Sequence, residues 1–217
     1  MIQVKDISKS FDKLKVLKGV SLSVSDGEML TIVGPSGAGK TTLLQIIGSL
    51  ERPDSGSVIF DGEDITAMKD SKLARFRNRN MGFVFQFHQL LPEFTLEENV
   101  ALPALIGGTA RGEAFSHARR LLEEIGLGAR LDHRPAQLSG GERQRAAVAR
   151  ALINDPKVIL ADGPTGSLDS HNPAELYRLF SDLRQATGKT FIIVTHDDTL
   201  ALNSDRVIRM NDGNIIQ

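Results

Sequence analysis

The strongest signal for the fold is the stretch Ile32-Val33-Gly34-Pro35-Ser36-Gly37-Ala38-Gly39-Lys40-Thr41-Thr42. An apolar run, Met29–Val33, precedes it, and apolar residues at helical spacing follow it from Leu43 onward. The stretch therefore predicts a strand, a glycine-rich loop and a helix, and it matches the phosphate-binding pattern G-x-x-x-x-G-K-[ST]. A glycine-rich turn with a surface lysine is the alternative. The flanking strand and helix favour a nucleoside triphosphate site.

Each residue type in this loop has a physical reason to contact phosphate. Backbone N–H groups of the loop and the positive end of the following helix face one anion-sized hollow. Lys40 can reach the β- and γ-phosphates, and the Thr41 hydroxyl can ligate Mg²⁺. The candidate nucleotide-binding residues are therefore Gly34, Pro35, Ser36, Gly37, Ala38, Gly39, Lys40, Thr41 and Thr42.

Composition places the chain among ordinary globular proteins. Its 217 residues fit one domain, 41% of them are hydrophobic, and the formal net charge is −1. This charge gives no indication of a nucleic-acid partner, and the lack of cysteine excludes disulfides and thiolate chemistry within the chain. The sequence has no secretory signal pattern and no apolar run of about 20 residues. We therefore expect a cytoplasmic protein, or one on the cytoplasmic face of a membrane.

Short apolar runs alternate with segments of helical periodicity along most of the chain. Strands are predicted at 2–4, 20–24, 29–33, 57–60, 81–85, 158–161 and 191–194, with a closing hairpin at 207–216. Helices are predicted after the glycine-rich loop and at 70–78, 111–125, 139–153 and 173–186. Buried strands that alternate with helices predict an α/β protein with a largely parallel sheet.

Residues 87–110 do not fit this alternation. The segment is apolar, yet Pro92 and Pro103 interrupt it. It is either an irregular part of the core or an apolar surface that meets a partner.

A second motif, Leu138-Ser139-Gly140-Gly141-Glu142-Arg143-Gln144, predicts a helix N-terminus that is open to an anion. Ser139 is a good N-cap, and Glu142 three residues later completes a capping box. Gly140 and Gly141 leave the first-turn N–H groups accessible. In isolation this could be only a well-capped helix. Together with the loop at Gly34–Thr41, it makes the chain resemble the nucleotide-binding subunits of ABC transporters, over essentially its whole length.

The resemblance implies a specific fold and assembly. It implies a single ABC-type nucleotide-binding domain over residues 1–217, with a P-loop NTPase-type parallel core, an antiparallel β subdomain and a helical subdomain at about 87–153. Two copies would clamp two ATP molecules head to tail, with Ser139, Gly140 and Gly141 of one copy on the γ-phosphate held by the other. The remaining partners implied are Mg²⁺ and integral membrane permease subunits.

Five further residues match family positions. By resemblance, Gln86 touches Mg²⁺ and the attacking water, and Asp162 holds Mg²⁺ through water. Asp169, in Ser167-Leu168-Asp169, crosses the dimer seam, and His196 contacts the γ-phosphate. Phe11 matches the aromatic residue that stacks on adenine, although the residues around it would by themselves favour a core or hairpin aromatic.

One position departs from the family pattern. The family has Asp-Glu-Pro-Thr after the buried strand, and this chain has Asp162-Gly163-Pro164-Thr165. The missing glutamate is the family's presumed general base, and glycine has no side chain to polarise or orient water. We therefore expect this chain to bind ATP but to hydrolyse it slowly, because Gly163 replaces the glutamate. The signature motif is intact, so the sequence favours neither an evolved nor an introduced substitution at Gly163.

Within the family, residues 87–100 resemble the branch that contains LolD and MacB. The short chain and the motif Leu90-Leu91-Pro92-Glu93-Phe94-Thr95 favour the LolD group, the ATPases of lipoprotein-releasing transporters. This implies ATP-driven release of lipoproteins, with the chain peripheral on the cytoplasmic face of the inner membrane. A MacB-like efflux ATPase and an FtsE-like cell-division ATPase are the alternatives. A soluble ABC protein acting on DNA or ribosomes would carry coiled-coil insertions or tandem ATPase domains, which this sequence lacks.

Overall fold

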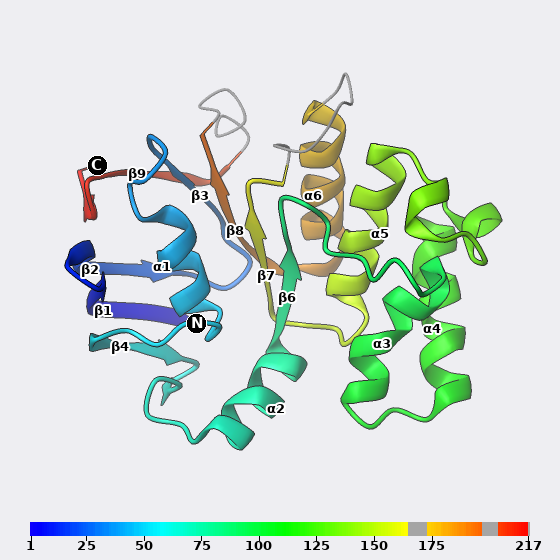
Figure 1. Cartoon of the computed structure of the whole chain (residues 1–217), viewed down its shortest axis with the longest axis horizontal. Helices are drawn as coiled ribbons and strands as arrows, with labels where there is room; N and C mark the ends of the chain where they lie inside the picture. Colours follow the sequence, from blue (N-terminus) through cyan, green and yellow to red (C-terminus); the bar gives the residue numbers. More distant parts are fainter. Residues whose placement is uncertain (165–172, 197–203, 217) are drawn as a thin grey trace.

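The computed structural model describes residues 1–164, 173–196 and 204–216, which form two sheets and a group of helices (Figure 1). The first sheet is antiparallel, with strand order β2-β1-β4-β5. Its strands are β1 (Ile2–Phe11), β2 (Leu14–Val24), β4 (Ser55–Phe60) and β5 (Glu63–Asp64). β1 and β2 form a hairpin and are much longer than the sequence predicted, because register shifts in β1 interrupt the regular alternation of buried residues.

The second sheet has the order β10-β9-β3-β8-β7-β6 and is parallel except for the β9–β10 pair. Its strands are β3 (Met29–Val33), β6 (Met81–Val84), β7 (Val158–Asp162), β8 (Thr190–Thr195), β9 (Arg206–Asn211) and β10 (Asn214–Ile215). All five residues of β3 are buried, as expected for a central parallel strand covered on both faces. The prediction of an α/β protein with a largely parallel sheet is confirmed.

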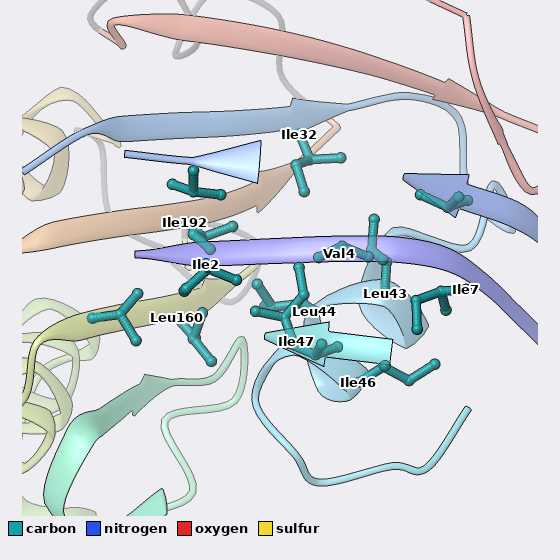
Figure 2. Close-up of a cluster of buried hydrophobic side chains, with 14 of the residues drawn as sticks. Ile2, Val4, Ile7, Ile32, Leu43, Leu44, Ile46, Ile47, Leu160 and Ile192 are labelled. Carbon is teal, nitrogen blue, oxygen red and sulfur yellow. The ribbon is translucent and has the colours of Figure 1, made fainter. Parts of the chain in front are cut away.

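Helix α1 (Lys40–Ile47) lies between the two sheets (Figure 1). Figure 2 shows its apolar side chains, among them Leu43 and Ile47, in one cluster with Ile2 of β1 and Ile32 of β3. A helix that is apolar on most sides is stable in such a position because both neighbours bury its surface. The packing fixes the start of α1 beside the end of β3, where the glycine-rich loop joins them.

Two helices cover the other face of the parallel sheet, α5 (Gly140–Leu152) and α6 (Pro173–Thr187). α5 is also part of a second group of helices, together with α3 (Leu96–Ile106) and α4 (Arg111–Glu124). Short 3-10 turns, η1 (Gly128–Arg130) and η2 (Pro135–Gln137), lead from α4 to α5. α5 therefore buries Val148 against the sheet and Ala146 against the helical group. The remaining helix, α2 (Asp70–Asn80), precedes β6.

The apolar segment at 87–110 proves to have two parts. Most residues near its start are exposed, among them Phe87 at 73%, although His88 is buried, whereas Leu96 and Val100 are fully buried on α3. Helix α3 was not predicted from the sequence, because Pro103 lies inside it. The signal that could have found the helix is Thr95 with Glu98, which form a capping box at its start.

Candidate nucleotide-binding site

The glycine-rich loop joins β3 to α1, and Gly39 is the residue that turns the chain into the helix. Its φ of +95° is in the left-handed region, and an added Cβ would lie 2.9 Å from the Val16 carbonyl oxygen. Only glycine therefore fits this position without strain. No side chain among the described residues caps α1, so its first N–H groups can donate to a bound anion.

Lys40 is the first residue of α1, and its ammonium group points back into the loop. Its Nζ donates to the carbonyl oxygens of Gly34 at 2.7 Å and of Pro35 at 2.9 Å. Burial lowers the pKa of Lys40, and the charge of Asp162 opposes this shift. The loop thus holds a cation at its centre, as a site for phosphate requires.

A cleft of about 510 Å³ opens beside this loop. The predicted residues that line it are Ser36, Gly37, Gly39, Lys40, Thr41, Thr42, Gln86, Asp162, Gly163 and His196. Gln86, Asp162 and His196 lie at or just beyond the carboxyl ends of β6, β7 and β8, the edge of a parallel sheet where ligands bind. Four of the lining residues were not predicted: Leu14, Val16, Val194 and Thr195.

Three predicted loop residues lie outside the lining of the cleft. Gly34 and Pro35 act through their carbonyl groups on Lys40, and Ala38 is buried in the core. Asp169 belongs to a prediction that falls outside the described residues, so the structure gives it no position.

Thr41 and Asp162 meet directly in the cleft. The Thr41 hydroxyl donates to Oδ1 of Asp162 at 2.9 Å. Burial raises the pKa of Asp162, while this hydrogen bond and the Lys40 charge act in the opposite direction. With the amide oxygen of Gln86, these side chains are an oxygen-only donor set, which suits Mg²⁺. No cluster of three or more acidic or histidine residues that could hold a metal occurs among the described residues.

Gly163 follows Asp162 and lies beside Gln86. Its N–H donates to the Val194 carbonyl at 2.8 Å, and its φ is +49°. A Cβ added at this position would lie 3.4 Å from Oε1 of Gln86. A side chain at 163 would therefore start close to the Gln86 amide, inside the cleft.

Phe11 lies at the end of β1, next to the cleft rather than in its wall. It pairs with Leu14 across the hairpin, and Leu14 lines the cleft. The ring is 44% exposed, so Phe11 is not a core aromatic. The Nζ of Lys9 lies over this ring, 5.1 Å from its centroid.

The signature motif forms the capped start of α5, as predicted. The Glu142 N–H donates to Oγ of Ser139 at 3.2 Å, and the Ser139 N–H donates to Glu142 at 2.8 Å. Arg130 also binds Glu142, and these bonds lower the pKa of the carboxyl group to about 2. Because folding lowers this pKa, the stabilisation is present above the ordinary pKa of 4.5 and is lost as the pH falls towards 2. Ser139 is exposed and does not line the chain's own cleft.

A glycine-rich phosphate loop, a facing aspartate and a separate capped helix start define an ATP-binding cassette. The chain belongs to the ABC transporter family, whose sequence model matches residues 17–166. The solved structure of the cassette MJ0796 bound to ADP and Pi is 38% identical, with a TM-score of 0.90 over the whole chain and 97% of that protein. A second dimeric MJ0796 structure is 39% identical, with a TM-score of 0.92.

Curated relatives place the chain more narrowly, in the LolD group. It is 59% identical to the lipoprotein-releasing system ATP-binding protein LolD of Bacteroides fragilis, over all of both chains. The LolD protein of Porphyromonas gingivalis is 56% identical over 98% of this chain and 97% of its own. These relatives confirm the resemblance to the LolD branch. None of the described helices has the length and apolar character needed to cross a bilayer.

Proposed function

We propose that this chain is the ATP-binding motor of a transporter that releases lipoproteins from the inner membrane. Two copies close on two MgATP molecules, and the closure moves membrane permease subunits from the cytoplasmic side. One observation carries the proposal: a single cleft joins the phosphate loop to Asp162, Gln86 and His196, while the Ser139 helix start lies outside it. The names of the LolD relatives support the cargo.

In this proposal each predicted residue has a separate role. The phosphates bind the loop and the Lys40 ammonium, and Thr41, Gln86 and Asp162 hold Mg²⁺. Phe11 stacks on the adenine, a contact worth roughly 1–3 kcal/mol. His196 contacts the γ-phosphate, and the second copy supplies Ser139, Gly140, Gly141 and Asp169.

The domain organisation is part of the same proposal. The whole chain, 1–217, acts as one nucleotide-binding domain with a helical subdomain at about 87–153. A groove of about 390 Å³ between α2, β6, α3 and α5 is lined by Phe83, Pro103 and Ile106, and also by Gln89 and Arg150. Ile106 is 71% exposed, and Phe87, two residues before Gln89, is 73% exposed. This apolar groove is where we place the permease subunits.

The cargo is tested by reconstitution. The chain and its copurified permease subunits are placed in liposomes that hold a fluorescent lipoprotein, and ATP-dependent transfer to a soluble acceptor is measured. We expect slow release with the unaltered chain and faster release with Gly163→Glu. If both versions bind ATP but neither releases lipoprotein, the cargo assignment is wrong, while the ATP-binding role stands.

The head-to-tail assembly is tested by Ser139→Arg. The arginine places bulk where the partner's phosphate must lie, so ATP should no longer produce a dimer, while ATP affinity of the single chain stays unchanged. Thr95→Arg is the matched control, because Thr95 caps α3 through the same kind of capping box. Both changes remove a cap worth about 0.5–2 kcal/mol. Light scattering that shows normal ATP-dependent dimers for Ser139→Arg would contradict the model.

A further inference from the structure

Arg150, in the last turn of α5, reaches from the helix to the segment that follows β6. Its Nη2 donates to the His88 carbonyl at 2.7 Å, and its Nη1 donates to the Gln89 carbonyl at 2.5 Å. A guanidinium group presents its donors as a rigid fork, so these two charge-assisted bonds fix the relative position of the helix and the segment. No carboxylate within the described ranges forms an ion pair with Arg150. The two carbonyl groups are therefore the partners that compensate for its partial burial.

The two carbonyls belong to an unusual piece of backbone. His88 and Gln89 have φ values of +60° and +48°, and neither is glycine. Two consecutive non-glycine residues in the left-handed region persist only where the surroundings hold them. The His88 side chain is buried, and its burial and the charges of Arg143 and Arg150 lower its pKa. Arg150 is thus placed to hold a strained turn.

This turn lies two residues beyond Gln86, which lines the nucleotide cleft. The other end of α5 carries Ser139. We infer that Arg150 is a positioning residue that sets the place of Gln86 in the cleft and links it to α5. A shift of α5, when its Ser139 end binds the partner's nucleotide, is then passed to Gln86. The inference rests on the proposed ATP-driven dimer.

The link can be tested without nucleotide. The chain has no tryptophan, so Phe87→Trp gives a single tryptophan reporter next to Gln86, at a side chain that is 73% exposed. In this background, Arg150→Met should lower the fluorescence anisotropy of the introduced indole towards that of a freely rotating side chain. The matched control is Arg52→Met, because Arg52 also donates to two backbone carbonyls, those of Thr66 and Met68, in a different part of the chain. The control should leave the anisotropy unchanged.

The second test of the inference measures the kinetics of ATP hydrolysis. In the Gly163→Glu background, Arg150→Met should lower kcat by about tenfold, because a displaced Gln86 misaligns the reacting groups. The rate is expressed per nucleotide-binding site, and KM should change by less than about threefold because the phosphate loop is untouched. Arg150→Lys should restore part of the rate, since an ammonium keeps the charge but not the fork.

The outcomes separate the inference from the proposed function. Unchanged anisotropy and kcat in Arg150→Met, or an equal effect of Arg52→Met, would overturn the positioning role. Failure of the unaltered chain to bind MgATP would overturn the proposed function. The nucleotide-free anisotropy would still decide whether Arg150 holds the segment.

Discussion

Replacing Gly163 with glutamate should raise steady-state ATP hydrolysis at least about tenfold, because a positioned general base contributes about 10²–10⁴-fold to rate. The unaltered chain has the predicted groups that line the described cleft, but glycine at position 163 offers no carboxylate to act as a general base. We therefore expect it to bind ATP and close, and then to remain closed because the γ-phosphate is cleaved slowly. Glutamate would also add a negative charge near the γ-phosphate, which should shorten the lifetime of the ATP-bound dimer.

The backbone conformation at Gly163 opposes the Gly163→Glu substitution. Its φ of +49° disfavours a side chain by roughly 1–2 kcal/mol, and a Cβ would touch the Gln86 amide. Gly163→Ala brings the same strain without a carboxylate, and Gly163→Gln adds length without a base. Phosphate release is measured for all four versions, with and without permease subunits. Equal rates for glycine and glutamate would contradict the prediction and move the catalytic role towards His196.

Lys40→Ala should weaken MgATP binding by about 100-fold. Two charge-assisted hydrogen bonds to phosphate together amount to about 3 kcal/mol, which corresponds to this factor. Lys40 is 9% exposed and lies at the centre of the loop, so bulk water does not screen its charge as it would at the surface. The dissociation constant is measured by isothermal titration calorimetry.

A surface lysine serves as the control for this change. Lys157 forms an ion pair with Asp61 at 2.5 Å, and neither residue lines the cleft, so Lys157→Ala should leave MgATP affinity unchanged. Thermal unfolding without nucleotide shows whether each variant is folded. Unchanged affinity of folded Lys40→Ala would remove the phosphate-loop interpretation.

Local sequence patterns predicted the parts of the fold that have local physical causes. β3 is a continuous apolar run, and the Ser139 cap of α5 needs only residues within one turn, so both could be recognised directly. The closeness of Gln86 and Asp162 could also be foreseen, because both follow parallel strands. Resemblance supplied their roles.

Long-range contacts account for most of what the sequence did not reveal. Because Pro103 lies inside α3, the sequence did not predict this helix. Its formation depends on burial of Leu96 and Val100 against α4 and α5. The extension of β1 to Phe11 depends on pairing with β2 across register shifts. The contacts of Arg150 could not be predicted, because its partners lie about 60 residues away in sequence and their unusual backbone has no sequence signature.

The contacts of Lys40 with Gly34 and Pro35 have a consequence for nucleotide exchange. An ammonium left alone in an empty site would oppose the departure of product, since an unpaired buried charge is costly. Here the carbonyl oxygens of Gly34 and Pro35 accept hydrogen bonds from the ammonium, so the loop itself supplies partners for the charge. These partners compete with the phosphates of ADP and of ATP alike, so they weaken retention of either nucleotide without discriminating between them. In the proposed cycle, once the dimer has opened, the relative concentrations of the two nucleotides determine which one occupies the site.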